Sequence, residues 1–424
     1  MIEKIITTLK AKKEIIFFII CFVIYTIPRS IEMLFPKIYK GINIIKAIVI
    51  ICIFAYFAVF FIKKDRKKIS KYSIGVMIYA LYIFIVTIFN KVNIVTCVKV
   101  YLLNVSVILL CEIIFNSDYK FEFIKFFTSY FLMLLVLNMI VLFLNYINNG
   151  TMINKENIYL LGQDNRFILY IIPTLLGYYY LNVNNKSGKF GMIITYIIGV
   201  ITLAVVWSVA SLAILIIIGL GFVVLKIINK YNIKINSYII LILLIALSVM
   251  IVFLKIQNCF ENFIVNVLHK SMTLSYRTIM WDDAKEMLIK NPVNLIFGFG
   301  YFDTKDSFVH MPIKVNHLHN IVMDPLFAGG IIGLIIYIGN LCILCNSINK
   351  ISENNKKNNI CLIFGTLLLL LTFDTFEMYQ IYYFILFLIL QAPKFCNNEE
   401  KINIQWRENL TKRRNIWVKN KIMR

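Results

Sequence analysis

Long apolar stretches recur along this chain and constrain its fold more than any other feature. A helix that crosses a bilayer needs roughly 20 mostly apolar residues, and about twelve stretches of the sequence meet that need. They cover residues 14 to 34, 42 to 62, 72 to 89, 94 to 115, 126 to 147, 168 to 183, 192 to 208, 210 to 228, 238 to 254, 331 to 348, 360 to 376 and 379 to 394. The sequence therefore predicts an all-α polytopic membrane protein with about 12 transmembrane helices. The shortest breaks between spans are "WSVAS", residues 207–211, and "FDTFEMYQ", residues 373–380.

The composition points to the same class of protein. Hydrophobic residues make up 60% of the chain and charged residues 16%, whereas soluble domains carry about 25% charged residues. The first span has the basic start of a signal peptide but no small-residue cleavage site after it, so we interpret it as a retained signal anchor. A net charge of +22 would suggest nucleic-acid binding in a soluble protein. Here the basic residues have a topological explanation, and we expect no nucleic-acid partner.

The positions of Lys and Arg predict the orientation of the chain, because cytoplasmic loops carry an excess of both. With the N-terminus inside and twelve alternating helices, 29 of the 44 Lys and Arg residues fall on the inner side and six in the short outer loops. Both termini are therefore predicted to be cytoplasmic, in the cytoplasmic membrane of a bacterium. The basic tail, residues 396–424, is expected to lie on the anionic inner surface of the membrane.

This topology divides the chain unevenly. Helices one to nine occupy residues 1–254, with a small outer loop at 148–167, and helices ten to twelve occupy residues 331–395. Between helices nine and ten lies one large extracytoplasmic loop, residues 255–330. A loop of that length in a compact protein is usually functional. The paired repeats typical of many transporters are not visible in the sequence.

An amphipathic helix is predicted near the middle of the large loop, from about 275 to 290. Ser275 is a suitable N-cap, apolar side chains recur with helical spacing, and Asn291 and Pro292 end the pattern. The face formed by Trp281, Ala284 and Leu288 is expected to pack against the membrane domain or its interface.

Arg277 falls in the first turn of this helix, where the macrodipole disfavours a cation. Two explanations fit: a phosphate group bound by the guanidinium, or an ion pair with a loop carboxylate such as Asp303 or Asp306. Arg166, in "GQDNRF" beside Gln163, allows a similar pair of interpretations, since it is either a bidentate ligand for an anion or an anchor at the membrane interface.

The sequence "HLHN" places His317, His319 and Asn320 close to the start of helix ten. Residues i and i+2 share a face of an extended segment, but a catalytic zinc site needs three protein ligands, and only His310 or nearby aspartates could complete one. We therefore expect no metal. An imidazole with an ordinary pKa of about 6.5 also suits a general base or a hydrogen-bonding group, and a purely structural loop histidine is the simplest alternative.

Two glycines stand in "LIFGFGYF", between the predicted amphipathic helix and the "HLHN" segment. Gly298 and Gly300 lack the following helix of a dinucleotide-binding fingerprint. They are expected to let the backbone approach a ligand or to turn the chain back over the membrane.

Four motifs in a fixed order carry a resemblance to a known family: "SYRTIMW", "NPVNLIFGFG", "HLHN" and "LFAGGIIGLIIY". Their order, spacing and outer location resemble the C-terminal region of the O-antigen ligase and polymerase family, the Wzy-like integral membrane glycosyltransferases. The resemblance covers roughly residues 200 to 376. One departure is that many members carry a Ser-Arg pair near "WSVAS", where this chain has no Arg.

The resemblance implies a GT-C-like fold in which the outer loop closes over a cleft at the membrane surface. It implies a donor glycan on undecaprenyl pyrophosphate, an acceptor hydroxyl, and no metal or other cofactor. Arg277 would hold pyrophosphate, and His319 would activate the acceptor or bind the donor, which makes these two the candidate catalytic residues. The candidate substrate-binding residues are Arg166, Asn320, His317 and Gln163.

The function expected from these features is polymerisation of lipid-linked oligosaccharide repeat units into a capsule or O-antigen-type polysaccharide. A ligase that transfers the glycan to a lipid or protein acceptor shares the same motifs and is the close alternative. A transporter or flippase of lipid-linked oligosaccharide is the alternative from another class, and intramembrane Lys99 and Glu112 would suit it. Membrane lipids, a flippase and a chain-length regulator are the further partners expected.

Overall fold

The computed structural model describes residues 2–28, 30–31, 35–63, 69–149, 158–184, 188–267, 272, 276–302 and 317–397. Apart from one two-stranded hairpin, the regular structure in these ranges is helical. The helices of the first half are α1 (Ile2–Tyr25), α3 (Pro36–Lys63), α4 (Lys71–Phe89), α5 (Ile94–Phe115), α6 (Lys120–Asn149) and α7 (Ile168–Val183). The later helices are α8 (Lys189–Val205), α9 (Val209–Lys230), α10 (Ser237–Leu254), α11 (Arg277–Lys290), α12 (Pro292–Phe297), α13 (Met323–Asn349), α14 (Asn354–Leu371), α15 (Gln380–Leu390) and α16 (Ala392–Cys396). The hairpin pairs β1 (Ile158–Tyr159) with β2 (Gly162–Gln163), and the short turns are η1 (Asp164–Arg166), η2 (Ile256–Phe260) and η3 (Phe263–Val267).

Seven of the described helices are long and apolar enough to cross a membrane, namely α3, α4, α5, α6, α9, α10 and α13. Three shorter apolar helices lie at Glu14–Tyr25, Lys189–Val205 and Gln380–Leu390. The predicted class, an all-α protein with several membrane-spanning helices, is confirmed. Each predicted span overlaps a helix, but the number of twelve crossings and the division of the chain around them stay predictions.

Helix α15 runs through the centre of the molecule. All residues from Ile381 to Ile389 are buried, and a helix that is hydrophobic all round belongs in a core. The ring of Phe384 packs against Phe22 of α1 and Phe127 of α6, with ring centroids 4.8 and 4.9 Å apart. Because α15 is central, the loop that leads into it, residues 372–379, is also held inside the protein.

Helix α13 has a kink at Gly330, whose φ of 62° no ordinary helical residue adopts. The segment around Gly298 packs into this kink, and Phe299 N–H and Gly300 N–H donate to Phe327 O and Ala328 O, both at 2.9 Å. The sequence left open whether these glycines let the backbone approach a ligand or turn the chain. In the structure they let one backbone approach another, just before the predicted span at 331–348 begins.

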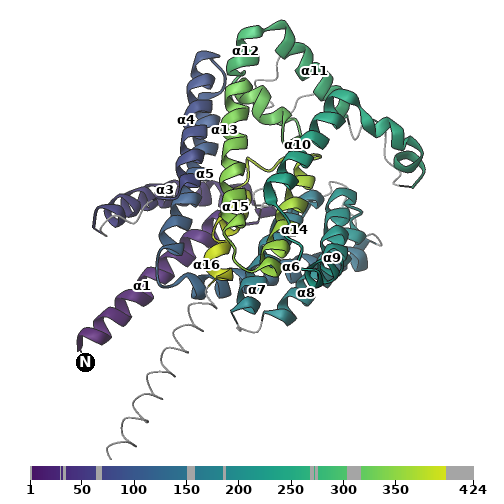
Figure 1. The fold of residues 1–424 in the computed structure, drawn as a ribbon. Coiled ribbons are helices and arrows are strands. Elements are labelled where there is room, and N and C mark those ends of the chain that lie inside the picture. The colour runs from purple at the N-terminus through teal and green to yellow at the C-terminus, as the bar shows by residue number, and fades with distance from the viewer. Residues whose placement is uncertain are drawn as a thin grey trace, which may run out of the picture.

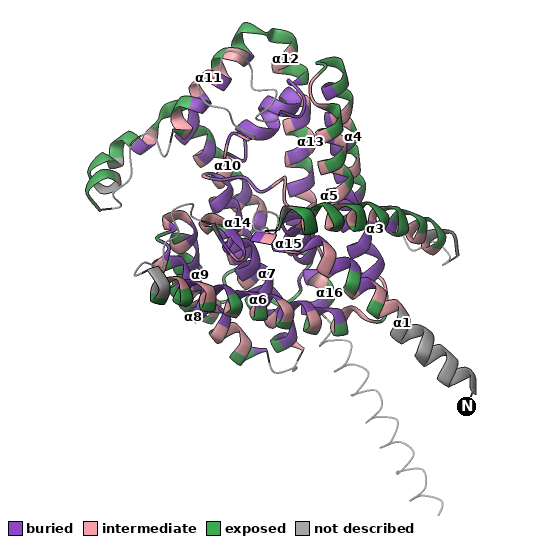
Figure 2. Ribbon diagram, turned by 180° about the vertical axis from the view of Figure 1, so that it is seen from behind, coloured by how far each residue is buried: buried purple, intermediate pink, exposed green. Residues whose placement is uncertain are grey.

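Helices α11 and α12 lie together at one end of the molecule, above α13 and α10 (Figure 1). Helix α11 occupies the range where the sequence predicts an amphipathic helix, and its buried residues are Met280, Trp281, Ala284 and Leu288. Its other side is exposed (Figure 2). The predicted N-cap, Ser275, lies outside the described residues. Helix α3 projects sideways from the body and is mostly exposed (Figures 1 and 2).

Candidate active site

Three elements hold the "HLHN" segment against the base of α11. Trp281 donates its indole N–H to Leu318 O at 2.6 Å, inside the core. Leu318 N–H donates in turn to the carboxylate of Asp324 in the first turn of α13, and Ile321 N–H donates to Leu371 O at 2.8 Å. The segment therefore connects α11, α13 and the end of α14.

Asn320 fixes the conformation of this segment. Its Oδ1 accepts hydrogen bonds from Ser248 Oγ of α10 at 2.9 Å and from the backbone N–H groups of Val322 and Met323 at 2.9 and 3.1 Å. Its Nδ2 donates to Thr372 O at 2.9 Å. The side chain is completely buried, so it caps the start of α13 and positions its neighbour. Its predicted substrate-binding role stays a prediction.

His319 has a left-handed backbone conformation, with a φ of 53°. Such conformations cost free energy outside glycine and are concentrated at functional sites. Its Nδ1 lies 2.6 Å from Oδ1 of Asp374. Burial alone would raise the pKa of Asp374, but the hydrogen bond and charge of His319, together with Arg277, outweigh it and lower the pKa to about 2. Since Asp374 is ionised, Nδ1 of His319 carries the proton, and Nε2 is the atom that can accept one.

Arg277 approaches the same carboxylate from α11. Its terminal nitrogen lies 3.7 Å from Oδ2 of Asp374, and Asn165 Nδ2 donates to that oxygen at 2.7 Å. Burial lowers the pKa of Arg277, while the Asp374 charge acts in the opposite direction. The structure shows an ion pair of this first-turn arginine with Asp374, and the predicted binding of a phosphate group by Arg277 stays a prediction. Asp303 and Asp306 lie outside the described residues.

The 148–167 loop contributes Asn165 and Arg166 through the turn η1. The guanidinium of Arg166 donates to Gln163 Oε1 at 2.8 Å and lies over the ring of Tyr379, 4.7 Å from its centroid. Two residues predicted from separate segments, Arg166 and His319, are thus both placed beside the 372–379 loop.

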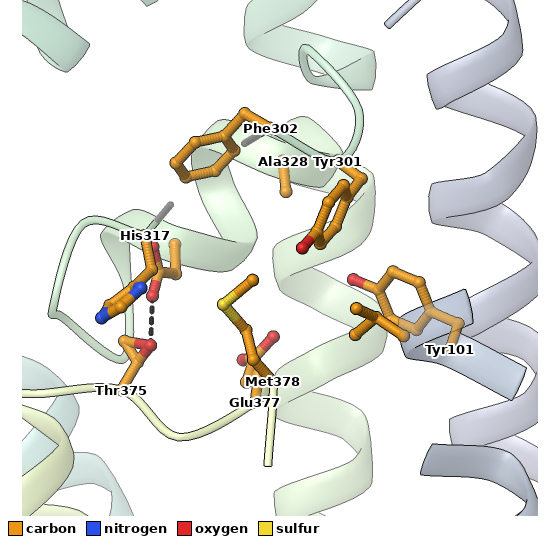
Figure 3. A pocket seen from close by; sticks show the side chains of 10 residues that line it. Tyr101, Tyr301, Phe302, His317, Ala328, Thr375, Glu377 and Met378 are labelled. Carbon is orange, nitrogen blue, oxygen red and sulfur yellow. Dashed lines mark hydrogen bonds between the residues drawn. The ribbon is translucent and has the colours of Figure 1, made fainter. Parts of the chain in front are cut away.

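His317 is close to His319, with ring centroids 4.1 Å apart. Burial lowers the pKa of His317 to about 3, and the neighbouring imidazole of His319 acts in the same direction. Its Nδ1 has no hydrogen-bond partner in the described part of the chain. Figure 3 shows its imidazole beside Thr375, and Glu377 lines the same cavity of about 40 Å³. Burial, then the charge of Asp324, raises the pKa of Glu377 to about 8, so this carboxyl is held mainly protonated at neutral pH.

A family model described as O-antigen ligase (Wzy_C) matches residues 194–338. This segment is similar to the O-antigen ligase family. The resemblance inferred from the sequence motifs is therefore confirmed. The O-antigen ligase segment covers about a third of the 424-residue chain and contains Arg277 and His319, whereas Asp374 and Arg166 lie outside it. Neither curated proteins nor solved structures gave a match to the chain.

A metal ion is one group this arrangement could hold. Ligand atoms of His317, His319 and Asp374 lie within 4.8 Å of one another, so Asp374 offers the third ligand atom that the sequence alone did not identify. The two histidines of the O-antigen ligase segment do not make a favourable cation site, however, because Arg277 is already paired with Asp374 and its charge repels a divalent cation. The expected metal independence stays a prediction.

Sequence inspection missed Asp374, which lies in the "FDTFEMYQ" break between two apolar stretches. An available signal was the pair of carboxyls, Asp374 and Glu377, between two membrane-spanning segments, since acids in such places are usually functional. The O-antigen ligase motifs could not reveal it because they end before residue 374.

Proposed function

We propose that the protein is a membrane glycosyltransferase of GT-C type that polymerises undecaprenyl-pyrophosphate-linked oligosaccharide repeat units. The observation that carries the proposal is the His319–Asp374 pair flanked by Arg277, built partly from the O-antigen ligase segment. A histidine oriented by a buried carboxylate is a general base, and glycosyl transfer from a lipid pyrophosphate needs one at the acceptor hydroxyl.

The chemistry follows from the positions of these groups. As the acceptor oxygen forms a bond to C1 of the donor sugar, Nε2 of His319 takes the hydroxyl proton. The bond between C1 and the pyrophosphate oxygen breaks, and the lipid pyrophosphate leaves with the electron pair. Asp374 stabilises the imidazolium that forms. Cations fixed in a water-poor site, including Arg277, stabilise the charge that develops on the leaving group.

A ligase is the second candidate, and the description of the matching family model supports it. Ligase and polymerase would share the donor, the base and the leaving group. They differ in the acceptor, which is another lipid-linked repeat unit for a polymerase and a different lipid or a protein for a ligase. The distribution of Lys and Arg favours a reaction on the outer face of the cytoplasmic membrane, where a flippase would supply substrate and a chain-length regulator would limit the product.

The transporter alternative receives no support from its two intramembrane charges. Glu112 accepts hydrogen bonds from Ser70 N–H, Ser73 Oγ and Asn116 Nδ2 at 3.0, 2.6 and 3.1 Å, which accounts for a buried carboxylate. Lys99 lies on the same helix about 20 Å away along its axis. The two residues therefore do not form a relay.

The proposal can be tested with purified protein in nanodiscs and a lipid-linked oligosaccharide substrate. We expect a ladder of longer lipid-linked glycans on a gel from the parent protein and no ladder from His319→Ala. Adding a lipid or protein acceptor separates the two candidates, because only a ligase would label it. A ladder of normal length from the His319→Ala variant would contradict both.

A further inference from the structure

A second and much larger cavity lies next to the site just described. It has a volume of about 420 Å³, and Tyr301 and Met378, both labelled in Figure 3, line it as well as the small cavity beside His317. Arg166 also reaches it, two residues from the start of α7. The two cavities are therefore neighbours across the 372–379 loop.

Positive charge is concentrated on the wall of this cavity. Three cationic side chains line it, Lys46 of α3, Lys99 of α5 and Arg166, and none of the described residues on its wall is acidic. On α3 the lining residues Tyr39, Asn43 and Lys46 follow a spacing of four and three, and Thr96, Lys99 and Leu103 lie three and four apart on α5. That spacing places each set on one face of its helix, so two helices both direct a lysine toward the same space.

The neighbouring Arg277 cluster contains an acid, Asp374. Arg277 and His319 share the carboxylate of Asp374, so much of their charge is compensated inside the protein. A bound pyrophosphate carries more charge than Arg277 can balance while it stays paired. The three cations of the cavity wall add positive charge next to this cluster, where a pyrophosphate would need it.

Apolar groups beside the cations indicate which kind of anion fits. Ile27, Val100 and Leu103 line the cavity together with the two lysines. Past Lys46, the same helix exposes Ile48 and Ile51 by 55% and 68%. Lys99 is itself exposed, which leaves the cavity accessible from the surface. A charged headgroup could lie among the cations while its hydrocarbon tail follows the apolar surface of α3.

From this arrangement we infer that the cavity binds the pyrophosphate headgroup of a polyprenyl lipid, with Lys46 and Lys99 as ligands alongside Arg166. That this lipid is the glycan donor rests on the proposed function, whereas the binding of an anionic lipid does not. The position next to His319 and Asp374 would bring the bond between sugar and pyrophosphate toward the general base. Lys46 and Lys99 are then substrate-binding residues contributed by helices outside the O-antigen ligase segment.

Titration of the full-length protein in neutral phosphatidylcholine nanodiscs tests this inference, with farnesyl pyrophosphate as the probe. Lys46→Gln and Lys99→Gln should each weaken binding by about tenfold, as expected for the loss of one charge-assisted contact. Lys46→Arg and Lys99→Arg should stay close to the parent, which separates charge from folding. Lys91→Gln is the matched control, since Lys91 is exposed between α4 and α5 and does not line the cavity. Unchanged binding in both Gln variants would overturn the inference.

Three competitors of farnesyl pyrophosphate binding show which part of the ligand the cavity recognises. Farnesol should not compete, and inorganic pyrophosphate should compete more weakly than farnesyl pyrophosphate. Equal competition by inorganic pyrophosphate would contradict a contribution of the lipid tail to binding. Equal competition by phosphatidylglycerol would contradict recognition of the pyrophosphate headgroup. An assay of glycan transfer distinguishes the two proposals. If the parent protein transfers glycan and the transfer rate is unchanged in Lys46→Gln and Lys99→Gln, only the inference about the cavity is refuted. A protein with lysine-dependent binding and no transfer refutes only the proposed function.

Discussion

Nδ1 of His319 and Oδ1 of Asp374 are 2.6 Å apart although 55 residues separate them in the chain. The contact joins the end of the large loop before α13 to the short loop between α14 and α15. Two features fix its geometry: the left-handed backbone of His319, next to the buried side chain of Asn320, and the burial of Asp374. A base and its orienting carboxylate are thus provided by two different segments.

Replacing Asp374 tests this pair directly. Asp374→Asn keeps the size of the side chain but removes the charge that holds the proton on Nδ1, so the transfer rate should fall by about 10² to 10⁴, the usual contribution of a general base. His319→Ala should cost a similar amount, and the double variant should cost little more because both residues act as one unit. Asp118→Asn is the control, since Asp118 is exposed in the turn between α5 and α6. Additive losses in the double variant would contradict a shared role.

Trp281 should support the site through one hydrogen bond. Trp281→Phe keeps the ring in the core but leaves Leu318 O buried without its donor, which costs about 1 to 3 kcal/mol. The variant should unfold at a lower temperature and transfer glycan more slowly, because Leu318 adjoins His319. Trp207→Phe changes a half-exposed tryptophan and should leave thermal unfolding near that of the parent. Equal effects of the two variants would argue against this role.

The helices could be predicted from the sequence, and Arg277 and His319 could be identified as candidate site residues, because their signals are local. Apolar stretches identify the spans, and Arg277 is conspicuous in the first turn of an amphipathic helix. The partner of Arg277 could not be predicted, since Asp374 is far away in the sequence and nothing near it indicates which loop it meets. Asn320 stands out beside the histidines, but only the packed structure reveals that Ser248 and Thr372 enclose it. In the sequence Lys46 and Lys99 are isolated charges within helices, and only the structure places both on one cavity.

Stability should depend on pH through His317. The pKa of His317 is lowered from its ordinary 6.5 to about 3 in the folded protein. Between these two values, His317 is protonated in the unfolded chain and neutral in the folded protein. Stability is therefore highest above about pH 6.5 and falls as the pH drops toward 3, by at most about 1.4 kcal/mol per pH unit. In His317→Gln, the decline of the unfolding temperature between pH 7 and pH 4 should be shallower. Identical slopes for the two proteins would show that another group is responsible.

The predicted orientation can be checked by labelling. A cysteine introduced between residues 300 and 310 should react with an impermeant thiol reagent added to intact cells, because this stretch belongs to the loop predicted to be outside. The background should carry Cys52→Ser and Cys259→Ser, since both native cysteines are exposed. Reaction only after the cells are lysed would reverse the topology, and it would move the proposed reaction to the cytoplasmic face.

The kink of α13 provides a final test, because the helix requires glycine at residue 330 but does not require it at residue 339. A Cβ on Gly330 would lie 2.3 Å from Ile296 O, at a φ of 62° that side chains rarely adopt. Gly330→Ala should therefore destabilise the protein by more than about 1 kcal/mol and separate the Gly298 segment from α13. A Cβ on Gly339, farther along the same helix, would meet no atom of another segment within 4 Å. Gly339→Ala should accordingly be neutral or stabilising by up to about 1 kcal/mol. Thermal unfolding of both variants in the same detergent gives the comparison, and equal unfolding temperatures would mean that the kink does not depend on glycine.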